Sequence, residues 1–369
     1  MAATPITVAE LEQLLAAAHG QSDGKVAKQL SDLELTERAS SIRLARWEAE
    51  FPGRHCHEAL TELADASAFL DLPAADLPAT APPDEDAQKA MLARTVEYVN
   101  KTVSRLPNFY ATRRTEHFED SPPRQTTGPS IGGRASALGG RGISAISSEQ
   151  SSYVPMHSAG SSNVTVSYRD GYELRGSKKV DPSRMGQTPG LNTAGEFGPI
   201  LSLVLDNAMR SQRTWGHWEQ TASGVAAVFR YSVPRGQSSY FVTLQHNGTI
   251  QQVFPAYHGE IAIDPADGAI LRVTVVADFA PPYNQEVSSI MVEYGSVSIG
   301  GAPYICPVKS VAFSKTAAFP GENGSPNQPP PLQTRFNDVA FIDYHIFRAE
   351  ARILTGDSVS NEEPPARPK

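Results

Sequence analysis

Two short stretches of the sequence each place a histidine and a glutamate two residues apart, a spacing that could serve acid–base chemistry. His217 and Glu219 stand in "GHWEQ", and His258 and Glu260 stand in "HGEIA". Side chains alternate across a β-strand, so each pair falls on one strand face, where one group can accept a proton and the other donate it. A polar strand face opposite a core residue such as Trp218 has the same pattern. The sequence leaves both interpretations open.

Other chemical motifs fail on spacing or order. In "HCH" at His55–His57, neighbouring positions on a helix face apart, so one metal ion could not easily take both imidazoles. "GYELRGSKK" inverts the phosphate-loop motif, because Ser177 precedes Lys178. No GxSxG stretch occurs, and no specific Ser/His/Asp set can be assembled. We expect no catalytic residue, no metal and no cofactor, and an enzyme using the His/Glu pairs is the less favoured alternative.

Charge and composition restrict the partners of the chain. The net charge of −8 and the pI near 5.6 argue against a nucleic-acid binder. No run of about 18 apolar residues occurs, so no transmembrane segment is expected, and no signal peptide is visible. Residues 1–105 hold 10 Lys and Arg against 17 Asp and Glu, a balance of −7, whereas the remainder is nearly neutral. This asymmetry and the length of 369 residues favour two units. We expect Cys56 and Cys306 to be separate thiols, although a bridge between the units stays open.

The first 105 residues have helical periodicity. Thr7 with Glu10 forms a capping box before the first apolar run, and further helical stretches follow. We predict a helical domain over residues 1–105, interrupted at 71–86 by a linker rich in proline and alanine. Packing or docking is the expected task of such a domain. Stretches rich in glycine, serine and proline near 121–152 and 319–331, and the tail at 356–369, predict disordered segments.

The remainder of the chain, 106–355, is predicted to be a β domain. The clearest element is a hairpin at 258–275, where Asp264, Pro265 and Gly268 supply the residues of a turn. Successive antiparallel strands of this kind build a twisted sheet with one apolar face that must be covered. The helix predicted at 195–209 covers part of that face. The sequence therefore predicts an α+β fold.

Aromatic residues cluster between positions 215 and 257 of this β domain. Aromatic side chains at strand spacing usually fill a core, but on an open sheet beneath one helix they can line a cavity. We therefore predict an apolar ligand cleft. Its residues would be Trp215, Trp218, Phe229, Tyr231, Phe241, Val273, Val275, Ile342 and Tyr344.

Several stretches also resemble a family of uncharacterised acidobacterial proteins over nearly the whole chain. They are "LPNFYATRRTEHFED", "EFGPILSLVL", "WGHWEQTASGVAAVFRYSVP", "YHGEIAIDPADGAILRVTV", "VEYGSVSIGGAPYICPVKSV" and "FNDVAFIDYHIF". Residues 107–355 resemble, by pattern, the LolA-like and RseB-type fold of periplasmic lipoprotein carriers. This resemblance implies a curved antiparallel half-barrel covered by one helix, a periplasmic or secreted location, and a concave face that holds acyl chains.

Two functions follow as expectations. The first is a non-enzymatic extracytoplasmic protein that binds a lipid or another apolar ligand in the concave face of the sheet. The second is a protein-interaction module, in which side chains of the chain itself fill the sheet and a protein partner binds through the N-terminal helical domain or a sheet edge.

Overall fold

The computed structural model describes the chain in several segments. They are residues 4–103, 105–122, 153–169, 172–175, 178–179, 191, 193, 196, 200, 212–222, 224–246, 249–318 and 331–347. The tail predicted at 356–369 and nearly all of the loops predicted near 121–152 and 319–331 lie outside the described residues. So does the helix predicted at 195–209, apart from Glu196 and Ile200.

Residues 4–66 build a small unit with its own core, called here the N-terminal unit. Thr7 caps the first helix, and Glu10 completes the predicted capping box. The core gathers around the fully buried Trp47. Two short parallel strands accompany the helices, a pairing that helical periodicity did not predict. The elements are β1 (Thr4–Ile6), α1 (Val8–Ala18), α2 (Asp23–Leu30), β2 (Leu33–Leu35), α3 (Ser41–Glu50) and α4 (Arg54–Ala66).

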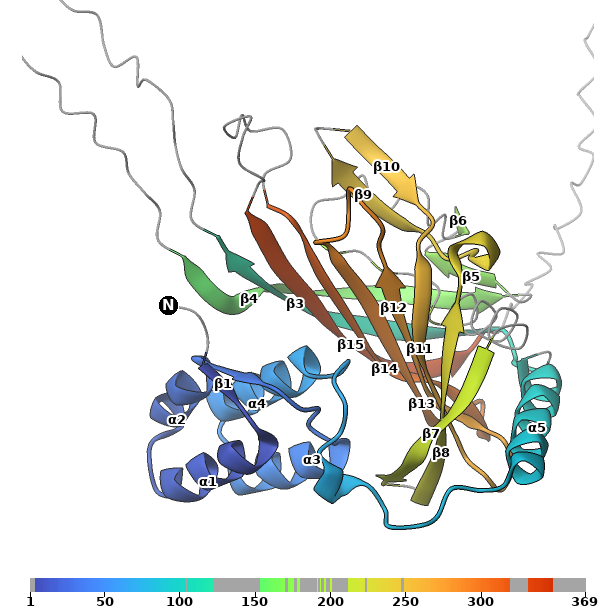
Figure 1. Ribbon diagram of the computed structural model, residues 1–369, viewed down its shortest axis with the longest axis horizontal. Coiled ribbons are helices and arrows are strands. Elements are labelled where there is room, and N and C mark those ends of the chain that lie inside the picture. The colour runs from blue at the N-terminus through green and yellow to red at the C-terminus, as the bar shows by residue number, and fades with distance from the viewer. Residues whose placement is uncertain are drawn as a thin grey trace, which may run out of the picture.

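A proline-rich linker joins this unit to a long helix on the other side of the sheet (Figure 1). The linker contains a short 3-10 helix, Ala74–Asp76, and passes the edge of the sheet, where the indole of Trp218 donates a hydrogen bond to the Ala81 carbonyl over 2.9 Å. Helix α5 (Glu85–Val103) follows. Its Met91 is buried in the core of the sheet. The boundary predicted at residue 105 grouped this helix with the N-terminal helices, whereas its apolar contacts lie with the sheet.

The described strands of the remaining chain form one large open sheet in which every pair is antiparallel. Its order is β6-β5-β4-β3-β15-β14-β13-β12-β11-β8-β7. The architecture is α+β, as predicted. The strands are β3 (Phe109–Ser121), β4 (Val154–Arg169), β5 (Tyr172–Arg175), β6 (Lys178–Lys179), β7 (Gln212–Thr221), β8 (Gly224–Val233), β11 (Ala256–Ile263), β12 (Ile270–Asp278), β13 (Val287–Ile299), β14 (Ala302–Ala317) and β15 (Leu332–Ile346). A separate hairpin, β9 (Val242–His246) with β10 (Thr249–Val253), follows a 3-10 turn at Arg235–Gln237.

The two faces of the sheet carry different covers, because side chains alternate along each strand. On the first face, called the α5 face, Val273 and Val292 pack with Met91 of α5. On the second face, called the N-terminal face, Met291 and Val311 pack with Ala68, just after α4. The sheet is therefore held between the N-terminal unit and α5.

The predicted hairpin is confirmed as strands β11 and β12. Within its turn, the backbone N–H of Gly268 donates to the Asp264 carbonyl over 2.9 Å, and Gly268 has a φ of +82°. This glycine also lies against helix α5, where an added Cβ would stand 2.6 Å from the Arg94 carbonyl carbon. Glycine is required here both for the left-handed backbone and for the close approach of the helix.

We expect Gly268→Ala to lower the free energy of unfolding by about 3 kcal/mol, from left-handed strain and from the displacement of backbone on α5. Gly20 is a matched control, because it has the same φ of +82° and no atom within 4 Å of an added Cβ. Gly20→Ala should lower the free energy by only about 1 kcal/mol. Urea denaturation of both variants measures the difference, and equal losses would show that the contact with α5 contributes nothing.

The prediction for the last strand needs correction. Ile342 and Tyr344 were predicted to line one cleft, but the pairing of β15 with β3 shifts between Ile342 and His345. Asp343 takes a φ of +55° at this irregularity, which breaks the alternation. Ile342, before the shift, keeps the register of Ala340 and is 40% exposed on the face opposite the buried Phe341, whereas Tyr344, beyond the shift, packs in the cluster around Phe109.

Candidate functional site

The structure brings most of the predicted cleft residues together on the α5 face. Phe229, Tyr231, Val273 and Val275 are at most 3% exposed and belong to one cluster. Trp215 and Trp218 are half-buried and pack against this cluster, with the Trp215 ring edge-on to Phe229 at 5.4 Å. Three predicted residues do not join it. Tyr344 lies in the neighbouring cluster, Phe241 contacts Phe254, and Ile342 is exposed.

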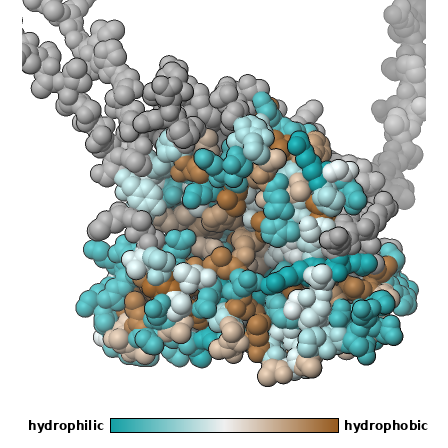
Figure 2. Space-filling view, in the orientation of Figure 1, coloured by the Kyte–Doolittle hydropathy of each residue, from teal (hydrophilic) through white to brown (hydrophobic). Residues whose placement is uncertain are grey.

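Half-buried aromatic side chains, called here the aromatic border, pack against the buried cluster at strand β7 and beside Tyr257. Trp215 and Trp218 lie 4.8 Å apart at strand β7, and Tyr240 lies 5.5 Å from the buried Tyr257. Beyond them the β9–β10 hairpin has apolar side chains at its ends and along β10, where Phe254 and Ile250 are exposed. Figure 2 shows that the visible surface is hollowed between this hairpin and the N-terminal unit, with apolar side chains in the hollow.

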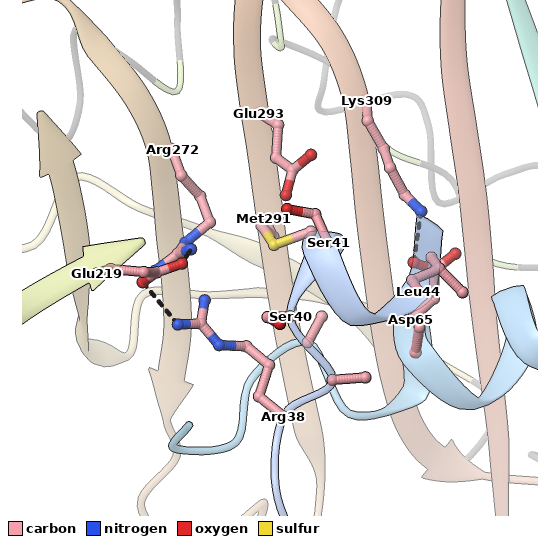
Figure 3. Close-up of a pocket in the computed structure, with 13 residues that line it drawn as sticks. Arg38, Ser40, Ser41, Leu44, Asp65, Glu219, Arg272, Met291, Glu293 and Lys309 are labelled. Carbon is pink, nitrogen blue, oxygen red and sulfur yellow. Dashed lines mark hydrogen bonds and ion pairs between the residues drawn. The ribbon is translucent and has the colours of Figure 1, made fainter. Parts of the chain in front are cut away.

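A second candidate site is a charged pocket between the N-terminal unit and the sheet (Figure 3). Its volume is about 130 Å³. The N-terminal unit contributes Arg38, Ser40, Ser41, Leu44 and Asp65, and the sheet contributes Glu219, Arg272, Met291, Glu293 and Lys309. The pocket combines three cationic and three acidic side chains with a small apolar wall.

Glu219 of β7 connects the two sides of this pocket. Its carboxylate accepts two hydrogen bonds from Arg272 of β12, at 2.6 and 2.8 Å, and one from Arg38 at 2.7 Å. All three side chains are buried. Burial by itself would raise the pKa of Glu219, but contacts from His217 and Arg272 and the positive charge of Arg38 outweigh it and hold the pKa well below its usual range. Glu219 is therefore an ionised anchor between two guanidinium groups.

Lys309 of β14 forms a second ion pair across the same interface. Its ammonium lies 2.6 Å from Asp65 of α4 and 3.6 Å from Asp338 of β15. Burial raises the pKa of Asp65 to about 8; the charge of Lys309 opposes this shift, whereas Asp338 and Glu293 add to it. In Figure 3 the carboxylate of Glu293 points toward Ser41 of α3. Acidic groups therefore outnumber the single ammonium at this end of the pocket.

The His/Glu pairs that suggested acid–base chemistry are held in ion pairs instead. His217 Nε2 lies 3.5 Å from Glu219 Oε2, without hydrogen-bond geometry, and Glu219 is already bound by two arginines. Glu260 contacts Arg272 and Arg230, both at 3.3 Å. His258 turns instead to Asp278, with its Nδ1 2.9 Å from a carboxylate oxygen, and is half exposed. The carboxylate of each pair is therefore bound by arginine side chains rather than by its histidine.

Sequence reasoning missed the partners that build the charged pocket. Alternation in the sequence places Arg272 in the polar register of its strand and Glu219 on the polar face of its own, which indicates solvent rather than a buried partner. Arg38, Asp65 and Lys309 carried no local signal, because their partners are far away in the chain. A charged residue within an otherwise apolar strand, as at Arg272, was the one sequence signal, since such a charge must be paired when it is buried.

Comparisons with known proteins add no relative. Among the described residues, no helix combines the length and the hydropathy needed to cross a bilayer. No protein-family model, no curated protein and no solved structure matches this chain significantly.

Proposed function

We propose that the protein binds an apolar ligand, such as a lipid acyl chain, by enclosure against the α5 face of its sheet. The observation that carries the proposal is the aromatic border, where Trp215, Trp218 and Tyr240 stand half-buried at the margin of a sealed apolar cluster. Each methylene of an acyl chain that is buried there would contribute roughly 0.8 kcal/mol. Holding such a ligand needs no covalent step, no metal and no cofactor.

Helix α5 is the cover that a ligand would displace. Met91 is its one buried apolar side chain in the cluster, and Leu92 and Val99 are only half-buried. The helix follows a linker rich in proline, whose residues 74–84 are mostly exposed. In this proposal α5 tilts away from the sheet, and the acyl chain takes the place of its side chains beside Trp215 and Trp218.

A protein-interaction module is the second candidate. The observation that favours it is that Phe229, Tyr231, Val273 and Val275 are already sealed by the chain itself. In that case the N-terminal unit would present the binding surface for a protein partner. An extracytoplasmic location, periplasmic or secreted, is part of the first proposal and is supported by the resemblance to lipoprotein carriers alone.

Tryptophan quenching by a brominated acyl chain tests the proposal. Of the three tryptophans, Trp215 and Trp218 border the cluster, and Trp47 is buried in the N-terminal unit. Titration with stearate that is brominated at mid-chain should quench the fluorescence saturably, because bromine quenches only at contact distance. Unbrominated stearate is the control probe.

The double variant Trp215→Phe/Trp218→Phe is the matched control protein, because only Trp47 remains to report. We expect its fluorescence to be unaffected by the brominated chain. Absence of saturable quenching in the unmodified protein would overturn the acyl-chain proposal and favour the interaction module. Equal quenching in the control variant would place the ligand away from the α5 face.

A further inference from the structure

Three neighbouring strands bring together a serine, a histidine and an asparagine that are far apart in the sequence. His117 of β3 pairs in register with Asn337 of β15, and Ser162 of β4 pairs with Thr115, two residues before His117. Nδ1 of His117 lies 2.8 Å from Oδ1 of Asn337, and Nε2 lies 3.2 Å from the Ser162 hydroxyl. The histidine thus stands between an amide oxygen and a hydroxyl, each on a different ring nitrogen.

The hydrogen bonds fix the direction in which a proton can move. The side-chain Nδ2 of Asn337 donates to the Leu191 carbonyl over 2.8 Å, and the amide is 3% exposed. Its Oδ1 must therefore face His117, so Nδ1 of the ring carries the hydrogen. The lone pair of Nε2 is then directed at the Ser162 hydroxyl. The hydroxyl must therefore donate this hydrogen bond. This is the tautomer and the order of contacts that activate a nucleophile in serine and cysteine hydrolases, including those with asparagine as third member.

The surroundings of Ser162 suit a reaction with a carbonyl group. Ser162 and His117 are half-buried, so they are neither sealed nor fully solvated. Arg113 stands on the same face of β3 as His117, four residues before it, and pairs directly with Val164, two residues from Ser162. Its guanidinium contacts Glu196 and Thr193, and its buried Nε has no hydrogen-bond partner among the described residues. A cation with an unused N–H beside a nucleophile can stabilise a developing oxyanion.

We propose that Ser162 is a nucleophile for acyl esters, with His117 as its general base and Asn337 as the positioning residue. Ser162 Oγ attacks the ester carbonyl while its proton passes to His117 Nε2. The bond to the alcohol oxygen breaks, and the alcohol leaves with that proton. Water then repeats the sequence on the acyl-serine, releasing a carboxylic acid and restoring Ser162. This inference goes beyond ligand binding and does not depend on it. Reactivity of Ser162 is measured by covalent labelling, whether or not an apolar ligand binds.

Labelling with an alkyl fluorophosphonate tests the nucleophile directly on the full chain. Ser162 should displace fluoride and form one phosphonyl adduct, seen by intact mass, and peptide mapping should place it on the segment that contains Ser162. Peptide mapping uses the unmodified protein, so its result does not depend on whether a substituted protein folds. No adduct at that serine after prolonged exposure would overturn the proposal, because an unreactive hydroxyl is what a simple hydrogen-bond ladder across strands would give.

Variants separate the three roles. Ser162→Ala should abolish the adduct, whereas Ser161→Ala, its exposed neighbour, should leave the rate unchanged. His117→Ala should slow labelling at least about 100-fold, the contribution of a general base. Asn337→Asp keeps an acceptor for the Nδ1–H of His117 and should retain most of the labelling rate. Asn337→Leu removes this acceptor and should lower the labelling rate at least about 10-fold. Equal rates in the two Asn337 variants would contradict the positioning role.

Discussion

Replacing Glu219 with glutamine is expected to lower the free energy of unfolding by about 3–5 kcal/mol. The carboxylate lies between Arg38 and Arg272, and all three side chains are buried. Removal of the negative charge leaves two guanidinium groups in a poorly solvated interface, where an unpaired charge is costly. The loss is measured by urea denaturation at neutral pH. Because Arg38 belongs to the N-terminal unit, hydrogen exchange should also rise at the contact between α4 and the sheet.

The matched control is Glu58→Gln on helix α4. Glu58 pairs with Arg54 one turn away, but both side chains are well exposed, so the change should be within about 0.5 kcal/mol. Glu219→Gln should lower the free energy of unfolding by less when Arg38 is also changed to methionine, because one of the two unpaired charges is then absent. A Glu219 variant as stable as the control would mean that water or mobile neighbours already screen the two arginines.

Lys309→Met is the second large effect, and it depends on pH. The ammonium is the close cationic partner of Asp65, and Asp338 and Glu293 add negative charge nearby. Without it, we expect the free energy of unfolding at pH 8 to fall by about 3 kcal/mol, because a buried carboxylate loses its cation. Denaturation midpoints at pH 5 and pH 8 measure the effect.

The sign of the pH effect follows from Asp65. Burial raises the pKa of its carboxyl to about 8 in the folded chain, against about 4 when unfolded. A group whose pKa is raised on folding stabilises the fold below the unfolded pKa, and that contribution is lost as pH rises through the folded pKa. Lys309→Met raises the pKa of Asp65 further. The substitution should therefore lower the free energy of unfolding more at pH 8 than at pH 5. Lys315→Met, at an exposed lysine of the same strand, should show no such dependence. A loss that is independent of pH would contradict the carboxylate explanation.

The sequence was sufficient for the parts of this fold that depend on local signals. The capping box at Thr7 and Glu10, and the β11–β12 hairpin with its turn at Asp264 and Gly268, are confirmed because capping and turn chemistry act within a few residues. Alternation along β8 and β12 also placed Phe229, Tyr231, Val273 and Val275 on one face. A buried strand face is the feature that a period of two predicts best.

Features that depend on long-range contacts could not be predicted in this way. Periodicity predicted α5 as a helix but not as the cover of a sheet, because its partner strands follow more than 100 residues later. The irregularity at Asp343 has no glycine to announce it, and it separates Tyr344 from the face that Ile342 occupies. The contact of His117 with Ser162 and Asn337 joins residues up to 220 positions apart, which no motif spacing records.

Native mass spectrometry of the gently purified protein tests the central claim most directly, namely that the α5 face of the sheet holds an apolar ligand. We predict a population heavier than the bare chain by the mass of a lipid or fatty acid. That mass should be released by mild collisional activation and be lost in the Trp215→Phe/Trp218→Phe variant. A bare mass for the unmodified protein, in every preparation and at every activation energy, would contradict the account.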